Sequence, residues 1–332
     1  YRNLVEKRNV DAIVGYISSG NCQALAPVAE ELKQFTIFAT CGTPRIFEEA
    51  ERKYVFRTMG HATADNVAAA MYVKEKFPDM KGYTGINQNY AWGQDSWRDF
   101  DLTLQQIMPN TKASDKTQFP KIFAGQYGSE ISAMSLDKAD LIHTSFWGGD
   151  LEAFIFQGNA RGLFKKKIGV FTVGGTAAYR LGKKLPNGLV LGARGPYGIL
   201  VKDRDSELNQ WFINTYKDIY GIYPSGPAYQ YGQAILAAKI AYDKAGSDAT
   251  SEQLADALRG ITFESFSTTI EMTLGNGHQA ATENGYGITE YDSENGENVV
   301  KDVKFYPASC VLPPEGQNSV DWIKGGMKGA KC

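Results

Sequence analysis

The sequence predicts an α/β protein built as two doubly wound, three-layer lobes. Two observations carry this prediction. Short apolar runs bounded by turn residues alternate with helical segments along most of the chain, as expected for strands buried on both faces of a parallel sheet. The chain also has 332 residues, which is too long for one ordinary core and suits two domains of about 150 residues each.

The composition is that of an ordinary soluble globular protein, with 43% hydrophobic and 22% charged residues. Lys and Arg number 35 against 37 Asp and Glu, for a net charge of -2, and no basic cluster occurs. Nucleic-acid binding is therefore disfavoured, because it needs a concentrated positive face. No apolar run approaches the roughly 20 residues of a membrane-spanning helix.

The first strand-helix-strand unit organises the chain. We expect strands at 10–15 and 35–40 around a helix at 23–33. Both strands end in small residues, Ser18-Ser19-Gly20-Asn21 and Cys41-Gly42-Thr43. Ligands of open α/β sheets sit at this edge, where hydroxyls, free amides and a helix N-terminus suit a small carboxylate. Ser18, Ser19, Gly42 and Thr43 are therefore candidate ligand contacts, and helix capping or an ordinary turn is the alternative.

An extended run at 54–58 and a helix from Thr63 to 77 follow, and we place the first crossing between lobes at the Pro78-Asp79 stop. A second series then begins. Its expected strands are at 82–88, 141–146, 167–175 and 188–194, and its expected helices are at 92–108, 128–138, 151–160 and 177–181.

Three helices come next, at 207–220, 229–245 and 254–258, the last with a capping box at Thr250–Gln253. We expect them to pack on the first lobe after a second crossing. The alternating segments after Gly260 predict hairpins that make the third crossing and add a strand to the second lobe. The predicted division is a first lobe of 1–80 plus 199–268, a second lobe of 81–198 plus 269–310, and an irregular tail at 311–332.

The four cysteines suggest two disulfides. Cys310 and Cys332 bracket a Pro/Gly-rich tail, and Cys22 and Cys41 sit at the tops of neighbouring strand-helix units. Free thiols are the alternative for each pair. Disulfides would agree with an oxidising compartment. No Cys-x-x-Cys or Cys/His spacing is present, so a structural metal is not expected.

The runs at 15–33 (GYISSGNCQALAPVAEELK), 38–44 (FATCGTP), 54–58 (YVFRT) and 87–93 (NQNYAWG) together resemble the type I periplasmic solute-binding proteins, the branched-chain amino-acid (Leu/Ile/Val) binding family of ABC importers. The similarity extends to near Gly277. It implies two lobes joined by three crossover segments, a periplasmic monomer exported with a signal, and a membrane permease as partner. Family members begin with a further strand-helix-strand unit before the segment equivalent to residues 1–5, so pocket residues from that unit cannot be named here.

The resemblance also implies roles for individual residues. The hydroxyl of Ser19 would take the ligand carboxylate, and Gly42 and Thr43 would meet the polar head of the ligand. Asn89 or Tyr90 would face the cleft. The remaining candidates are Trp147 as an aromatic cover over the ligand, Gly148 beside it, Gly175 and Thr176 in a second-lobe loop, and Tyr229 near the inter-lobe face. For Trp147 and Tyr229, a position in the core is the alternative.

The loop Gly174-Gly175-Thr176 departs from the family pattern. Leucine-type members carry a glutamate there for the α-ammonium group of the ligand, and this chain offers no acid. An unpaired ammonium in a closed cleft costs several kcal/mol. Either another acid such as Asp150 substitutes, or the ligand is an aromatic or aliphatic carboxylate without an amine. Arg194 and Tyr197 could contact such a ligand, although a surface salt bridge is the alternative for the arginine.

The sequence gives no sign of catalysis or of a cofactor. His61, His143 and His278 are scattered and are interpreted as structural. No nucleophile elbow, GxGxxG after a strand, P-loop or metal motif occurs. A sensory ligand-binding domain of a receptor remains an alternative, as does an enzyme on the same fold, which would need a titratable pair within hydrogen-bond reach in the cleft.

Overall fold

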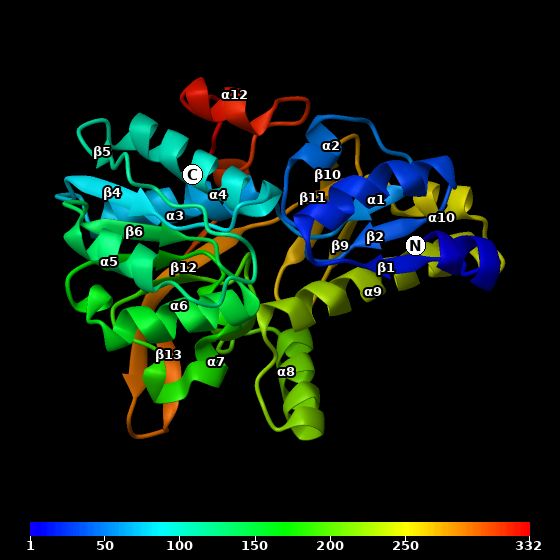
Figure 1. Ribbon diagram of the computed structural model, residues 1–332. Helices are drawn as coiled ribbons and strands as arrows, with labels where there is room; N and C mark the ends of the chain where they lie inside the picture. Colours follow the sequence, from blue (N-terminus) through cyan, green and yellow to red (C-terminus); the bar gives the residue numbers. More distant parts are fainter.

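The computed structural model describes all 332 residues as two α/β lobes lying side by side (Figure 1). The first lobe holds a six-stranded sheet of order β1-β2-β3-β11-β10-β9, and the second a seven-stranded sheet of order β13-β12-β8-β7-β6-β4-β5. The strands of the first sheet are β1 (Ile13–Gly15), β2 (Thr36–Phe38), β3 (Val55–Arg57), β9 (Thr262–Glu264), β10 (Thr269–Leu274) and β11 (Gln279–Ala281). Those of the second are β4 (Gly82–Gly85), β5 (Lys112–Ala113), β6 (Leu141–Thr144), β7 (Ile168–Phe171), β8 (Val190–Gly192), β12 (Asn284–Asp292) and β13 (Glu297–Tyr306).

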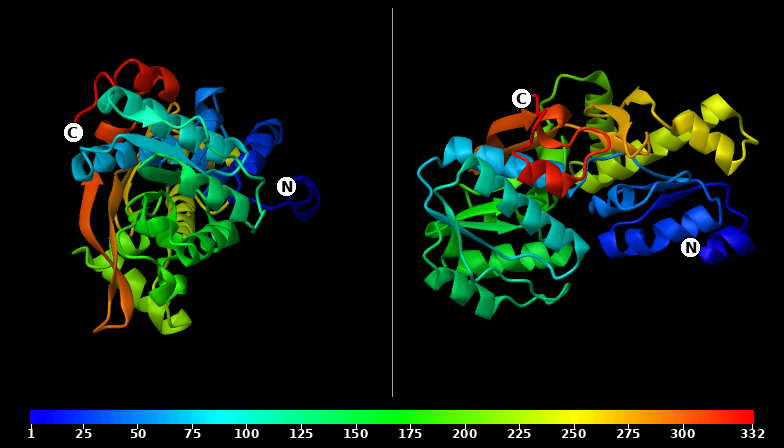
Figure 2. Two further views of the ribbon diagram at one scale, coloured as in Figure 1. Left: turned by 60° about the vertical axis from the view of Figure 1, so that its left-hand side comes forward. Right: turned by 90° about the horizontal axis from the view of Figure 1, so that it is seen from above.

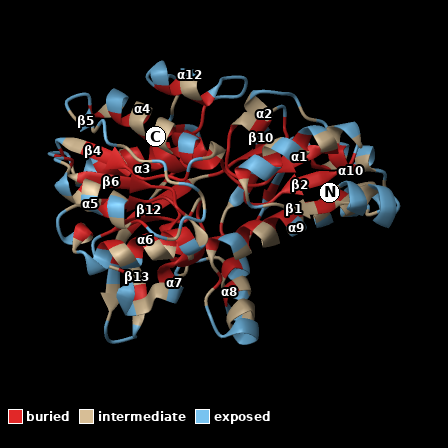
Figure 3. Cartoon of the chain, in the orientation of Figure 1, coloured by how far each residue is buried: buried red, intermediate tan, exposed pale blue.

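The centre of each sheet is parallel. In the first lobe β1, β2, β3 and β11 run parallel, and in the second lobe β5, β4, β6, β7 and β8 do. Antiparallel strands complete one edge of each sheet. Strands β2, β3 and β6 are buried along their whole length, because helices cover both faces of the sheets. The buried residues accordingly follow the sheets and the helix faces turned toward them (Figure 3).

The helices sort into two groups. The first lobe carries α1 (Ser19–Glu31), α2 (Arg45–Glu48), α9 (Gly226–Ala245) and α10 (Ser251–Leu258). The second carries α3 (Ala62–Lys76), α4 (Ala91–Ile107), α5 (Gly128–Leu136), α6 (Gly148–Ala160), α7 (Ala178–Leu181), α11 (Ala308–Val311) and α12 (Ser319–Lys324). The capping box that the sequence predicts at Thr250 is present, with Gln253 as its partner. Helix α8 (Glu207–Tyr220) projects beside α9 (Figure 1).

The chain crosses between the lobes three times, as predicted, but the first crossing lies earlier than expected. It falls between β3 and α3, at residues 58–61, and not at Pro78. Helix α3 packs against α4 and β12 of the second lobe. The physical reason is that small and apolar residues run around α3 from Ala62 to Val73, and the structure buries almost all of this stretch, so the helix needs neighbours on more than one side. His61, and not Thr63, caps this helix through its Nδ1.

The third crossing lies later than expected. Strands β10 and β11 pair within the first sheet, so the chain enters the second lobe between β11 and β12 and not at Thr269. The alternate residues Ile270 and Met272 pack into the first-lobe core with Phe263. The hairpin predicted at the turn 275–277 forms between β10 and β11, but it belongs to the first lobe, whereas the hairpin predicted across 293–298 forms between β12 and β13 of the second lobe.

Two further predictions need correction. Of the three helices after the second crossing, α9 and α10 pack on the first lobe, but α8 does not, because its Phe212 and Ile213 pack with Tyr229 in a second-lobe cluster. The tail after Val311 is not irregular throughout. Helix α12 packs on α4, with Trp322 and Ile323 buried in the second-lobe core.

Both predicted disulfides are present, Cys22–Cys41 and Cys310–Cys332. The first ties α1 to the loop that follows β2, and the second fastens the C-terminal tail to α11. Seen from above, the two lobes meet along one side and are connected there by the crossing segments (Figure 2). None of the helices combines the length and apolar character that crossing a membrane requires.

Candidate functional site

A cavity of about 200 Å³ lies where the lobes face each other. This is smaller than the roughly 300–1,000 Å³ of sites for drug-sized ligands, and it suits a small solute. The first lobe forms one wall with the segments that follow β1 and β2, and the second lobe forms a larger wall. The N-terminus of α9 completes the lining. The lining residues are Ile17, Ser19, Thr40, Tyr90, Trp92, Trp147, Gly148, Val173, Thr176, Arg180, Ala193, Arg194, Ser225, Pro227 and Gln230.

Ser19 begins α1 and is the buried hydroxyl of the first-lobe wall. Its Oγ accepts hydrogen bonds from the backbone amides of Gly42 (3.1 Å) and Thr43 (3.2 Å). A hydroxyl has two acceptor positions and one proton. Since the amides occupy both acceptor positions, the Ser19 proton is left to donate, and it is held at the positive end of a helix.

Gly42 and Thr43 support this wall without lining the cavity. A Cβ on Gly42 would lie 2.3 Å from Nη2 of Arg194 and 2.4 Å from the ring of Trp92. Glycine is therefore required for the second-lobe side chains to approach the backbone. The Thr43 hydroxyl turns away from the cavity and donates to Oδ2 of Asp95 at 2.6 Å.

Aromatic rings form most of the second-lobe wall. Trp92 is 2% exposed and donates its indole N–H to the Ser145 carbonyl at 2.8 Å. Trp147 donates its indole N–H to the Tyr90 hydroxyl at 2.7 Å, which leaves the Tyr90 proton to donate elsewhere. Val173 packs beside these rings. Flat apolar surfaces with one polar handle suit a planar or compact apolar solute.

Arg194 is the charged group of the site. It follows β8 with a positive φ of 60°, a conformation that costs most residues energy and is concentrated at functional sites. Its guanidinium lies 4.1 Å from the centre of the Trp92 ring and donates from Nη1 to the Thr40 carbonyl of the first lobe at 2.5 Å. Nη2 has no partner, although it is buried.

The nearest carboxylate does not neutralise Arg194 fully. Asp65 lies behind it, with Oδ2 at 3.6 Å from Nε, beyond hydrogen-bond distance. Burial lowers the pKa of Arg194, and Asp65 opposes this shift. Burial raises the pKa of Asp65 to about 6, and Arg194 and Asn284 oppose that shift. A buried cation with a free donor calls for an anionic partner.

No acidic side chain lines the cavity. Asp150, the substitute that the sequence analysis considers, is buried outside it and accepts from Gln88 at 2.6 Å and from the Phe123 amide at 2.7 Å. These bonds attach the loop that contains Phe123 to α6. The Asp150 carboxylate is therefore not available to an ammonium group. The charged residues of the lining are Arg194 and, at the exposed rim, Arg180.

The structure brings five of the predicted site residues together around the cavity. These are Ser19, Tyr90, Trp147, Gly148 and Thr176. The other six lie elsewhere. Ser18 is the N-cap residue of α1 without a side-chain cap, and Gly42 and Thr43 lie behind Ser19. Asn89 is exposed, and Gly175 packs against Ala193. Tyr229 is buried and donates its hydroxyl proton to Asn209.

Sequence reasoning named Arg194 only as a possible ligand contact, with a surface salt bridge as the alternative, and it missed Trp92. The signal for Arg194 was its position directly after a buried strand, at the same sheet edge as the other candidates. The sequence also does not point to Ser225, Pro227 and Gln230, because they lie at the N-cap and in the first turns of α9, whose N-terminus reaches the cavity only through the second crossing.

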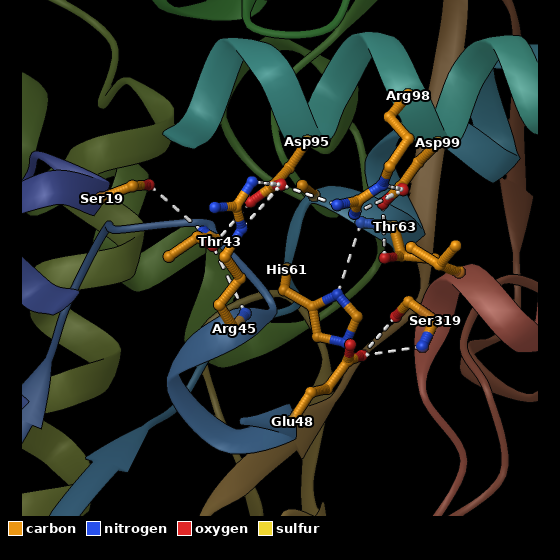
Figure 4. A network of polar contacts seen from close by, with 12 residues as sticks. Ser19, Thr43, Arg45, Glu48, His61, Thr63, Asp95, Arg98, Asp99 and Ser319 are labelled. Carbon is orange, nitrogen blue, oxygen red and sulfur yellow. Dashed lines mark hydrogen bonds and ion pairs between the residues drawn. The ribbon is translucent and has the colours of Figure 1, made fainter. Parts of the chain in front are cut away.

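A charged network joins the lobes behind this cavity (Figure 4). Asp95 of α4 is fully buried and accepts from Thr43, from Arg45 of α2 at 2.7 Å and from Arg98 at 2.9 Å. Arg98 also binds Asp99, whose other oxygen accepts from Thr63 at 2.7 Å. Because Thr43 also donates its amide to Ser19, the network is connected directly to the ligand wall.

Comparison with solved structures gives the same architecture at low sequence identity. A solute-binding protein of an ABC transporter from Rhodopseudomonas palustris BisB5, in complex with 3,4-dihydroxybenzoic acid, is 19% identical with a TM-score of 0.80, covering 92% of this chain and 81% of that chain. One from R. palustris in complex with benzoate is 18% identical with a TM-score of 0.75, covering 91% and 79%. The leucine-binding protein LivK from Thermotoga maritima MSB8 is 18% identical with a TM-score of 0.71, covering 91% and 81%.

No curated protein matches the chain. A family model does, over most of its length: the model described as periplasmic binding protein matches residues 1–297. This range includes both sheets up to the start of β13 and every residue that lines the cavity. The chain therefore belongs to the periplasmic binding protein family.

Proposed function

We propose that this protein is the extracytoplasmic solute-binding component of an ABC importer and that it captures a small carboxylate without an amine. The observation that carries the proposal is that Arg194, whose Nη2 has no hydrogen-bond partner, lines a cavity that no acidic side chain lines. The family supports a transport role. The aromatic-acid complexes among the similar structures support a carboxylate as ligand.

The ligand would bind between the lobes. Its carboxylate would accept from the Ser19 hydroxyl on the first lobe and from Arg194 on the second, and its apolar part would lie among Tyr90, Trp92 and Trp147. Contacts to both lobes favour the arrangement in which the lobes approach each other, because the ligand then gains the second set of contacts. A membrane permease would receive the solute from that form.

Pairs of compounds that differ only by the ammonium group test this proposal. Binding of 3-phenylpropanoate against L-phenylalanine, and of 4-methylpentanoate against L-leucine, is measured by calorimetry, with benzoate and 4-hydroxybenzoate as further ligands. We expect the compounds without an amine to bind at least about 100-fold more tightly, since an unpaired ammonium costs several kcal/mol. Benzamide, which lacks the charge, controls for the carboxylate. Equal or tighter binding of the amino acids would contradict the proposal.

A further inference from the structure

The second lobe has an outer end that points away from the cleft. The strands β5, β4, β6 and β7 are parallel neighbours, so they all begin at the same edge of the sheet. The residues Trp147, Val173 and Ala193, which follow β6, β7 and β8, line the cavity between the lobes. The starts of these strands therefore lie at the opposite end of the lobe, away from the first lobe (Figure 1).

Lysines gather at this outer end. Lys81 directly precedes β4, Lys112 begins β5, Lys138 shortly precedes β6, and the run 165–167 directly precedes β7. The pairing of the strands sets these starts side by side across the sheet. Separate stretches of the sequence thus form one surface, the lysine edge, which consists of these six lysines and Lys116.

A hollow of about 520 Å³ lies within the lysine edge. Its lining includes Lys81, Lys112, Lys116 and Lys138 together with Leu136. Leu136 is the last residue of α5 and is 83% exposed, more than any other large hydrophobic side chain of the chain. An exposed apolar side chain among lysines is typical of proteins that lie on the surface of an anionic membrane.

Almost all of these lysines are free of partners within the protein. The ammonium group of Lys167 donates to the carbonyls of Asp137 at 2.6 Å and Ala139 at 2.5 Å. None of the other six takes part in an ion pair. The ion-paired lysines of the chain are Lys53, Lys76, Lys202, Lys239, Lys301 and Lys304.

The aspartates at the same end do not neutralise the lysine edge. Asp137 and Asp140 accept hydrogen bonds from backbone amides, and Asp137 also accepts from the Ser114 hydroxyl at 2.5 Å. Asp79 and Asp115 are exposed. Seven lysines against four aspartates leave this end positive, although the whole chain has a net charge of -2.

We propose that the lysine edge docks on the anionic surface of a lipid membrane, with the ammonium groups at the headgroup phosphates and Leu136 between the headgroups. This inference goes beyond the proposed function, because it uses no residue of the cleft. Flexible lysines suit mobile headgroups, whereas an ordered acidic partner favours the rigid fork of arginine. Docking through the outer end leaves the cleft free to receive a solute.

Sedimentation with lipid vesicles tests the proposal. We expect the protein to bind vesicles of phosphatidylcholine that contain about one-third phosphatidylglycerol, but not vesicles of phosphatidylcholine alone. Salt at about 0.5 M should release it, because salt screens exposed charges. Combining Lys81→Gln, Lys116→Gln and Lys138→Gln should lower the partition coefficient by about 100-fold, since each lysine near an anionic surface contributes a factor of about five.

The matched control combines Lys7→Gln, Lys33→Gln and Lys244→Gln, which removes three exposed lysines from the first lobe. It should bind the vesicles like the parent protein. Leu136→Ser should weaken vesicle binding by about fivefold, because an apolar contact with the membrane is lost, and should leave any binding of soluble polyglutamate unchanged.

Three outcomes would overturn the proposal. They are a parent protein that does not sediment with the anionic vesicles, equal binding by the two triple variants, and polyglutamate binding as tight as vesicle binding, which would indicate an acidic protein partner. All substituted residues are exposed and lie outside the cleft, so the variants should keep the affinity of the parent protein for carboxylates. A failure here is therefore distinguishable from a failure of the proposed transport function.

Discussion

The arginines between the lobes fall into two sets that differ in how they are neutralised. Arg45 and Arg98 each reach a carboxylate at 2.7 Å, although their side chains are about one-third exposed, at 32% and 31%. Arg194 is 10% exposed and reaches a carboxylate only at 3.6 Å, and the fully buried Arg57 forms no ion pair. The more deeply buried set is the less well paired.

Burial without a partner is the more costly situation for a charge, so the difference indicates different purposes. Within the paired set, Arg45 connects α2 of the first lobe to Asp95 of α4 in the second, and Arg98 neutralises Asp95 and Asp99 within α4. Each of the underpaired arginines has a buried Nη2 without a hydrogen-bond partner, and Arg194 lines the cavity between the lobes. An anion that binds beside such an arginine stabilises its charge. The free-energy cost of burying the unpaired charge is then partly recovered as binding affinity.

The largest expected effect is from Arg194→Gln. This change removes the charge that faces the ligand carboxylate, and truncating one partner of a buried charge pair costs about 2–5 kcal/mol. We expect the affinity for benzoate or the tightest binder among the carboxylates to fall by about 100-fold or more, as measured by calorimetry. Arg180→Gln is the comparison variant, because Arg180 is at the rim and pairs with Glu152. It should lose less than about fivefold.

A glutamine variant that binds as tightly as the parent protein would contradict the role of Arg194. It would place this arginine in the same set as Arg45 and Arg98. Benzamide separates the two cases further, because its affinity should be nearly equal in the parent and the variant if Arg194 acts through the carboxylate charge.

A smaller effect is expected from Asp95→Asn, which removes the charge that the paired set shares. Arg45 and Arg98 would keep an acceptor oxygen but lose an ion pair. Because both arginines are partly exposed, we expect the free energy of unfolding to fall by about 1–3 kcal/mol. Ligand affinity should fall by about tenfold at most, through a smaller population of the arrangement with the lobes together.

Urea unfolding and calorimetry on the same preparations measure both quantities for Asp95→Asn. Asp101→Asn, on the same helix, is the control, since Asp101 contacts Tyr83 and Gln105 within the second lobe. An affinity loss as large as that of Arg194→Gln would show that the network acts on the ligand directly and not through the lobes.

The sequence predicts the two-lobe fold well, because the alternation of buried strands and helices is a local signal. Its errors concern which lobe a segment joins. Helix α3 and strands β10 and β11 were assigned to the wrong lobe, since their own patterns of apolar residues fit either core. The disulfides were predictable, because few alternative pairings of four cysteines suit these positions.

The candidate site was predictable only in part. Ser19 and Trp147 follow strands and lie at the expected sheet edge, whereas Trp92 is the second residue of helix α4, where the pattern favours a core position. The difference between Arg45 and Arg194 was not predictable at all. Arg45 begins α2 after the segment that follows β2, and Arg194 follows β8 closely. Only the three-dimensional structure shows that Asp95 comes within 2.7 Å of Arg45, while Asp65 stays at 3.6 Å from Arg194.

The smallest expected effect is a pH dependence of carboxylate binding, which arises from Asp65, the acidic neighbour of Arg194. Burial raises the pKa of Asp65 to about 6, with Arg194 and Asn284 opposing. A bound carboxylate competes for Arg194 and so raises that pKa further, which means that binding takes up a proton. Affinity should therefore increase as pH falls, by about two- to threefold between pH 7.5 and 5.5, a range in which carboxylic acids with a pKa of about 4 remain ionised.

Calorimetry across this range checks the sign of the pH dependence, with Asp65→Asn as the test variant. Asparagine keeps an acceptor for Asn284, which donates to Oδ1 of Asp65 at 2.6 Å, and it cannot titrate, so the slope should vanish.

Burial also raises the pKa of Asp99 to about 6, but Asp99 binds Arg98 in the paired set, so Asp99→Asn should retain the slope. The three histidines do not interfere, because burial lowers the pKa of His143 to about 3, that of His278 to about 4 and that of His61 well below its usual value. A slope that survives in Asp65→Asn and vanishes in Asp99→Asn would reverse the assignment of the two arginine sets.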